Sequence, residues 1–116
     1  MIPGSSAARG EIWLADLNPV CGHKQAGRRP VPVVSVDPFN RSKADLVVVV
    51  PVTSTVCGIP FHVTVEPPDG GLKNPSALLC DAVRSISKDR LVVHWGNVSS
   101  KIMAEVEDRL RVLLGL

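Results

Sequence analysis

The chain has 116 residues, and 45% of them are apolar, which suits one hydrophobic core but not two. It holds two Trp, two Phe and no Tyr, a content that argues against a nucleic-acid platform built on serial base stacking and against an aromatic groove for proline-rich peptides. The formal net charge of +2 is too small to indicate a polyanionic partner unless the positive side chains cluster.

The first residues are rich in Gly, Ser and Ala and lack the apolar segment of a secretory signal. We therefore expect residues 1–8 to form a disordered tail before a single domain over residues 9–116. The longest apolar run, residues 46–50, is too short to span a membrane. The three widely spaced cysteines (Cys21, Cys57 and Cys80) are an odd number, which favours reduced thiols and a cytoplasmic location.

In the first part of the chain, rough alternation predicts a strand over residues 9–17. A glycine-punctuated basic loop, residues 22–30, follows it. A second strand is expected over residues 31–36, with an edge or a bulge at Pro32 because proline cannot donate to a sheet ladder. Residues 37–43 predict a turn-rich connection with a short helical turn.

The middle of the chain begins with a mostly β-branched run at residues 46–50, which is typical of a strand buried on both faces. Residues 53–58 are expected to form a polar linker. Residues 61–66 then alternate cleanly, so Val63 and Val65 should point inward and His62 outward, to solvent or a dimer face. Residues 67–71 predict a turn.

One strand is expected over residues 76–86 and a last strand over residues 91–98, joined by a tight polar connection. The apolar period then becomes helical, with Ser99 or Ser100 as the N-cap and with ion pairs Glu105–Arg109 and Glu107–Arg111 on the polar face. Many short strands closed by one helix predict a mainly β protein with helices (α+β class), a small SH3-like β-barrel; an open sheet packed on a helix is the alternative.

The basic loop is the first candidate site, because loops held by a rigid sheet often carry function. It places two arginines, a lysine, a histidine and a glutamine between apolar segments (His23, Lys24, Gln25, Arg28 and Arg29). Pro30 restricts the backbone of Arg29 to extended conformations. The pattern therefore favours a loop that grips a phosphate group.

Several stretches resemble, in order, the MazF/PemK family of toxin endoribonucleases. They are Arg9-Gly10-Glu11-Ile12-Trp13, Asp16-Leu17-Asn18-Pro19, the Gly22 to Pro30 loop, Val50-Pro51-Val52-Thr53-Ser54, Gly58-Ile59-Pro60-Phe61, Asp81-Ala82-Val83-Arg84-Ser85-Ile86, and the terminal helix. The similarity runs from about residue 9 to the end of the chain, so it is more than a single motif. Two positions depart from the family pattern: Lys24 stands where Glu is common, and Ala82 replaces a frequent Gln.

The resemblance implies a CcdB-like SH3 barrel that forms a homodimer and cleaves single-stranded RNA at short sequences without a metal ion or cofactor. It implies catalytic roles for Arg29 and Thr53, and neutralisation by an antitoxin with an acidic, flexible C-terminal segment. The RNA-binding candidates are Lys24, Gln25, Arg28, Asn40, Ser54, Ser76, Asp81 and Arg84. Because Lys24 and Ala82 depart from the pattern, the family's cleavage sequence cannot be transferred to this chain.

Elementary chemistry supports part of this assignment. In metal-free cleavage the 2′-OH attacks the adjacent phosphorus, and the products carry a 2′,3′-cyclic phosphate and a 5′-OH. Arg29 would offer a planar cationic fork to the phosphoryl oxygens, and Thr53 a hydroxyl on a strand end. An arginine side chain holds its proton across the physiological pH range, which makes it a poor general base, so His23 is an optional proton acceptor or phosphate contact.

Other interpretations remain open. A gyrase-targeting toxin of CcdB type would share the barrel and act through Gly115 and Leu116, and a non-catalytic RNA-binding barrel would bind RNA without turnover. Cys21 and His23 alone are too few to indicate a metal site. His94 and Trp13 are expected to have packing roles.

Overall fold

The structure, a computed structural model, describes residues 7–17 and 27–116. Two α-helices and several short 3-10 turns (labelled η) accompany the strands. The elements, in chain order, are β1 (Glu11–Asp16), β2 (Arg28–Pro32), α1 (Asp37–Asn40), β3 (Leu46–Val49), β4 (Val52–Thr53), β5 (His62–Val65), η2 (Asp69–Gly71), β6 (Ser76–Leu79), η3 (Cys80–Ala82), β7 (Arg84–Ser87), η4 (Lys88–Arg90), β8 (Leu91–Asn97) and α2 (Ser100–Leu114).

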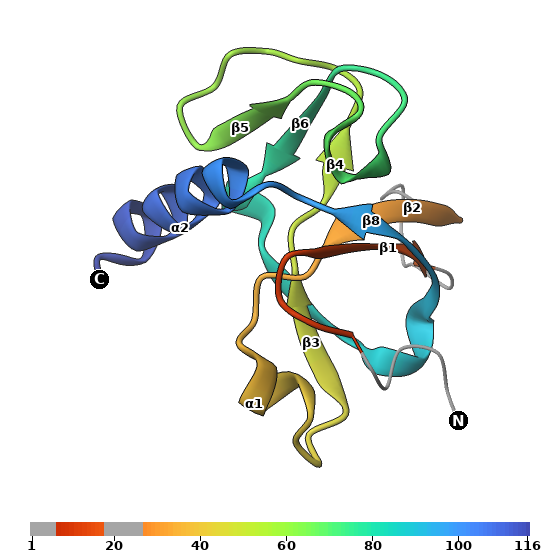
Figure 1. The fold of residues 1–116 in the computed structure, drawn as a ribbon. Coiled ribbons are helices and arrows are strands. Elements are labelled where there is room, and N and C mark those ends of the chain that lie inside the picture. Colours follow the sequence, from red (N-terminus) through yellow and green to blue (C-terminus); the bar gives the residue numbers. More distant parts are fainter. Residues whose placement is uncertain (1–6, 18–26) are drawn as a thin grey trace.

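The strands form three small antiparallel sheets with the orders β2-β1-β8, β3-β7 and β4-β6-β5 (Figure 1). Backbone hydrogen bonds continue from one sheet toward the next: Val34 N donates to Val48 O at 2.9 Å, and Leu79 N donates to Pro51 O at 2.8 Å. Within the described ranges the three sheets do not join into one closed ring. The mainly β class with a C-terminal helix is thus confirmed, whereas a fully closed barrel is not formed by these residues.

β1 lies between two apolar clusters, which explains why both of its faces are buried. Ile12 belongs to a cluster beneath α2 that includes Val65, Leu78 and Val106. Trp13, the next residue, belongs to a second cluster of ten buried apolar residues that includes Val31, Val47 and Leu91. A strand between two cores fixes its own register, because a slip by one residue would exchange the side chains of the two clusters.

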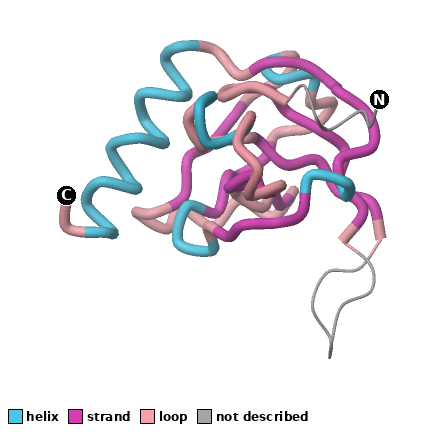
Figure 2. The backbone as a smooth tube through the Cα atoms, turned by 90° about the horizontal axis from the view of Figure 1, so that it is seen from below, coloured by secondary structure: helices cyan, strands magenta, loops and turns pink. Residues whose placement is uncertain are grey.

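α2 packs along one side of the strands (Figure 2) and begins at one of the two serines expected to cap it. Ser99 is the N-cap, and its Oγ accepts a hydrogen bond from Ile102 N at 3.2 Å. Gly115 ends the helix in the left-handed region at φ 72°, where glycine is favoured. The buried face carries Ile102 and Val106 and contacts β5 and η3.

The ion pairs expected along α2 are not formed. Arg109 instead pairs with its neighbour Asp108, and its Nε donates to Pro60 O at 2.8 Å. Glu107 pairs with Arg9, which also donates to Val34 O, so the start of the described chain is tied to the last helix. These alternative partners outcompete the weak i,i+4 pairs of an isolated helix.

The η2 turn lies directly against β8 because glycines remove side chains at the contact. A Cβ on Gly96 would stand 2.8 Å from Gly70 O, and a Cβ on Gly71 would stand 2.9 Å from Trp95 O, both too close for real atoms. Gly70 and Gly71 also have φ of 69° and 79°. This contact fixes where the segment after η2 runs, and that segment lines the cavity described below.

Some strand predictions need correction. The second strand runs over Arg28–Pro32, not 31–36, because Arg28 to Pro30 pair with β1. Its position at the sheet edge agrees with the expectation for Pro32. The expected strand over 76–86 is broken at η3, where the chain leaves the β4-β6-β5 sheet and joins β3. The expectation that β3 is buried on both faces holds beyond its first residue: Val47 and Val49 lie in one apolar cluster and Val48 packs against the other, whereas Leu46 is exposed.

The polar corner around Lys88 and Asn40 also differs from expectation. Lys88, predicted in a tight polar connection, is buried, and its Nζ donates to Asn40 O at 2.7 Å. The Asn40 side chain is buried too, accepting from Ser35 Oγ and donating to Ser35 O at 2.9 Å.

Ala7 is buried, although residues 1–8 were expected to form a disordered tail. No helix in the described part of the chain is long and apolar enough to cross a membrane.

Candidate functional site

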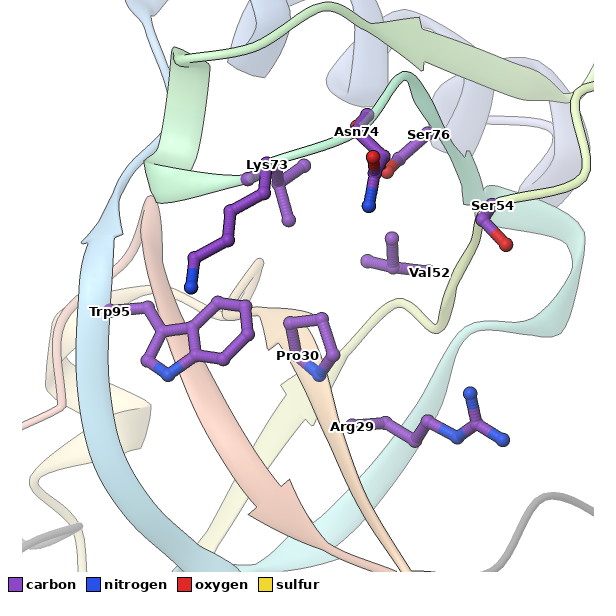
Figure 3. A pocket seen from close by; sticks show the side chains of 9 residues that line it. Arg29, Pro30, Val52, Ser54, Lys73, Asn74, Ser76 and Trp95 are labelled. Atoms are coloured by element: carbon purple, nitrogen blue, oxygen red, sulfur yellow. The ribbon is translucent and has the colours of Figure 1, made fainter.

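A cavity of about 220 Å³ opens between β2, β4, β8 and the segment that follows η2. Its lining combines apolar and cationic side chains (Figure 3): Arg29, Pro30, Val52, Ser54, Leu72, Lys73, Asn74, Ser76 and Trp95. Three of the residues singled out from sequence, namely Arg29, Ser54 and Ser76, therefore meet here. They come from three different strands or strand ends, which only the fold brings together.

Arg29 stands on the rim of this cavity. It lies on the edge strand β2, where it pairs with Ala15 of β1, so its backbone is held while its side chain remains exposed. Within the described ranges its guanidinium makes no ion pair and no side-chain hydrogen bond. In Figure 3 its side chain extends away from Trp95. A held but unengaged guanidinium is suited to receive a phosphate.

Thr53 lies close to the cavity in sequence but is not part of its lining. It forms the two-residue strand β4 with Val52 and pairs with Ala77 of β6. Its neighbours on both sides, Val52 and Ser54, do line the cavity. The Thr53 Oγ1 accepts a hydrogen bond from Thr55 N at 3.1 Å, which restrains the hydroxyl and leaves its proton free to donate.

The remaining sequence candidates are distributed as follows. His23, Lys24 and Gln25 lie outside the described residues. Arg28 is exposed at the start of β2, next to Arg29. Arg84 lines a second cavity of about 340 Å³, together with Ala82 and Val49, so it does not belong to the first.

Two candidates have roles that the sequence did not indicate. Asp81 sits in η3, and its Oδ1 lies 3.3 Å from His62 Nε2. The His62 side chain is only 11% exposed, so the expectation that it faces outward is wrong. The prediction that Asn40 contacts RNA is also wrong, because its side chain is buried and bonded to Ser35.

Sequence reasoning missed the polar and aromatic lining residues Lys73, Asn74 and Trp95. Lys73 and Asn74 follow the η2 turn, and no pattern signals a site there. Trp95 was expected on a strand, and it does lie on β8, but the pairing around it is irregular. Ile12 pairs with Gly96 and Trp13 pairs with His94, so Trp95 is the extra residue of a β-bulge. Bulges re-aim side chains and are frequent next to functional sites.

The other rings and thiols have structural surroundings. His94 stacks on Trp13 with ring centroids 5.5 Å apart, which agrees with the packing roles expected of both residues. Cys80 is fully buried, and this burial raises the pKa of its thiol from an ordinary 9.0 to about 11. Cys57 is a free and exposed thiol. Among the residues that the structure describes, no group of three or more His, Cys, Asp or Glu side chains is placed to hold a metal ion.

Comparisons with known proteins agree on one family. Residues 8–114 match the PemK-like, MazF-like toxins of type II toxin–antitoxin systems. The chain is 36% identical over 110 residues to the endoribonuclease MazF of Staphylococcus saprophyticus, covering 93% of this chain and 91% of the relative.

Solved structures show the same likeness in three dimensions. Crystalline MazF from Deinococcus radiodurans superposes with a TM-score of 0.80 at 32% identity, covering 95% of this chain and 97% of that one. An endoribonuclease from a mycobacterial species, solved in complex with its cognate antitoxin, gives a TM-score of 0.79 at 29% identity, covering 96% and 97%.

Proposed function

The chain belongs to the family of PemK-like, MazF-like toxins of type II toxin–antitoxin systems, and on that premise we propose that it is an endoribonuclease toxin that cleaves single-stranded RNA at specific sequences. The observation that carries the proposal is the placement of Arg29. An exposed guanidinium that has no side-chain partner among the described residues, held by an edge strand at the rim of the cavity, is arranged to bind one RNA phosphate.

The proposed reaction is a metal-independent transesterification. The 2′-oxygen forms a bond to phosphorus while the bond from phosphorus to the 5′-oxygen breaks; the 2′-OH loses its proton to a base, and the leaving oxygen gains one from an acid. The products are a 2′,3′-cyclic phosphate and a 5′-OH. Arg29 would stabilise the charge that builds up on the phosphoryl oxygens, and Thr53 would donate its hydroxyl proton to the same group.

The proton carriers need a separate assignment, because a guanidinium suits charge stabilisation better than proton transfer. His23 is proposed as an optional base or phosphate contact. The proposed RNA contacts include Lys24, Gln25, Arg28, Ser54, Ser76, Asp81 and Arg84. Of these, Ser54 and Ser76 share the cavity with Arg29.

We propose that a homodimer and an antitoxin complete the system. A symmetric pair would join two modestly basic surfaces into a longer groove. The mycobacterial relative was solved with its cognate antitoxin, and an acidic, flexible segment would complement the same groove here. The proposed compartment is the cytoplasm, where exposed thiols such as that of Cys57 remain reduced.

The test is cleavage of a mixed-sequence RNA by purified protein, followed by mapping of the 5′ ends. Fragments with 5′-OH ends, formed equally well in EDTA, are expected. Arg29→Ala and Thr53→Ala, each shown to be folded, should cleave far more slowly, whereas Arg111→Ala, an exposed arginine on α2 outside the cavity, should cleave at the normal rate. If a folded Arg29→Ala variant cleaved normally, the assignment of this site would be wrong.

The same assay separates the two rival functions. A gyrase-targeting toxin would produce no RNA fragments and would depend on Gly115 and Leu116 for growth arrest. An RNA-binding protein without turnover would retain RNA but leave it intact. Inhibition by EDTA that is reversed by a divalent cation would contradict the metal-independent reaction.

A further inference from the structure

We propose that the cavity beside Arg29 is a subsite for one nucleobase of the RNA, with Trp95 as its stacking surface. This inference rests on the proposed function for the identity of the ligand, and adds to it a residue that sets affinity and base preference. Trp95 has not been assigned a role by any sequence pattern in this chain. Its position, its exposure and its neighbours together point to a ring ligand.

The indole of Trp95 is partly exposed to solvent. Trp95 is 41% exposed, whereas Trp13, on the neighbouring strand β1, is 5% exposed and packs in the core. The Trp95 ring is directed by the bulge opposite Ile12 and Trp13, where it has no partner residue in the ladder. A strand irregularity that leaves a large aromatic side chain partly open is unfavourable for folding alone.

The size and composition of the cavity suit a single nucleobase. Its volume of about 220 Å³ is below the roughly 300–1,000 Å³ of pockets for drug-sized ligands, so it fits a single ring system. Pro30, Val52 and Leu72 give it apolar walls around the indole. Few aromatic residues exclude a long stacking platform, but one tryptophan is sufficient for one base.

Polar side chains at the rim of the cavity are available to a base. In Figure 3 the Lys73 side chain extends toward Trp95, and the Asn74 amide points into the cavity. Neither side chain forms an ion pair or hydrogen bond with the residues that the structure describes. A carboxamide offers both a donor and an acceptor, which suits the edge of a base.

The cavity beside Trp95 is continuous with the proposed reaction site at Arg29. Arg29 and Trp95 line opposite ends of the same cavity, so a phosphate on the guanidinium and a base on the indole can belong to adjoining parts of one strand. The charge is complementary as well, because Arg29 and Lys73 flank the cavity with two cations. A nucleotide satisfies the aromatic wall and the cations at once, which an apolar peptide would not.

The experiment uses the full-length chain and a short RNA whose 2′-hydroxyls are all methylated, so that it binds but lacks the nucleophile. Binding should quench the fluorescence of the wild-type protein, and should still do so in Trp13→Phe. Trp95→Leu should lose this quenching and bind on the order of tenfold more weakly, while Trp95→Phe keeps most of the affinity through its ring. Val93→Ala, an exposed residue on the same strand outside the cavity, is the matched control and should bind normally.

Removing one base at a time from the oligonucleotide locates the contact. One abasic position should weaken binding to the wild-type protein by the same factor as Trp95→Leu, and should have no further effect on that variant. Equal affinity of wild type and Trp95→Leu would overturn the inference. So would a Trp95→Leu variant that changes only the oligomeric state, which would assign the indole to a contact between copies of the chain.

Cleavage of unmodified RNA, measured in parallel, keeps the two proposals separate. Normal cleavage with unaltered binding in Trp95→Leu rejects the base subsite and leaves the endoribonuclease intact. If one base of the RNA quenches the fluorescence of the protein but no RNA is cleaved, the proposed endoribonuclease activity is rejected and the base subsite is retained. If the protein neither binds nor cleaves RNA, both proposals fail.

Discussion

Two sets of cations in this molecule have opposite surroundings. At the corner near α1, Lys88 is buried with its Nζ on Asn40 O, and across the molecule Arg9 joins Val34 O to Glu107. At the cavity rim, Arg29 and Lys73 have no such partners in the described ranges. The first set holds the fold together, and the second is available to a ligand. The difference indicates function only because the structure shows which charges are already engaged.

The sharpest way to break this comparison is Arg29→Ala. Loss of a well-placed donor to a developing oxyanion lowers the rate by about 10²–10³-fold, and we expect that loss here without a change in unfolding free energy, because the side chain is exposed and has no partner among the described residues. Initial cleavage rates and urea unfolding measure the two quantities. A stability loss as large as that of a core mutation would place Arg29 in the first set instead.

The two described thiols repeat the contrast between open and covered groups. At pH 7.5 an alkylating reagent should label Cys57 rapidly and Cys80 hardly at all, because the thiolate is the reactive form and burial raises the pKa of Cys80 to about 11. A Cys21→Ser background removes the third thiol from the measurement. Mass spectrometry of peptides gives both rates, and comparable rates would contradict the buried position of Cys80.

The same thiol makes stability depend on alkaline pH. Because the folded-state pKa is raised, the contribution of Cys80 is fully present below about pH 9 and is lost as the pH rises toward 11. The wild-type protein should therefore lose stability over that interval more steeply than Cys80→Ala does. Urea unfolding at a series of pH values measures the slopes, and parallel slopes would contradict the prediction.

Lys88→Met tests the engaged set. The substitution keeps much of the side-chain volume but removes the donor to Asn40 O, so unfolding free energy should fall by about 1–3 kcal/mol. The rate of RNA cleavage by the folded fraction should not change. Lys43→Met, at an exposed position in the neighbouring loop, is the control and should alter neither quantity.

Ser99→Ala is expected to have the smallest effect of this series. Loss of the N-cap hydrogen bond to Ile102 N should lower unfolding free energy by about 1 kcal/mol, with cleavage unchanged. Ser100→Ala, one position later and outside the cap, should be close to neutral. If the two variants proved equally stable, the cap would be assigned to the wrong residue.

Sequence reasoning succeeded where the determining interactions are local. The bounds of β1 and β8 were predicted within one or two residues, and the helical spacing and serine cap located the start of α2. It failed at residues 76–86, because Cys80 to Ala82 turn the chain from one sheet to another without a glycine or proline to mark the place. Partners distant in sequence, not local preference, decide such a change.

The site shows the same division. Arg29 and Thr53 were found through resemblance to a family, and Arg29 is seen at the cavity rim, while the catalytic roles of both remain predictions. The role of Trp95 could not be predicted, because a bulge depends on how two strands pair and has no signature in the sequence of one strand alone. Asn40 was misassigned for a related reason: only the folded chain shows that Ser35 and Lys88 occupy its polar atoms.

The glycines where η2 meets β8 have a consequence for mutational surveys of this chain. Any side chain at position 71 or 96 would collide with backbone atoms and displace the segment that carries Lys73 and Asn74. In a saturation library selected for toxicity, both positions should thus tolerate almost no replacement, although neither glycine has a functional group to offer RNA. Intolerance at these positions would reflect the close approach of two backbone segments. A survey that scores only the depletion of variants would wrongly assign both glycines to the catalytic or RNA-binding site.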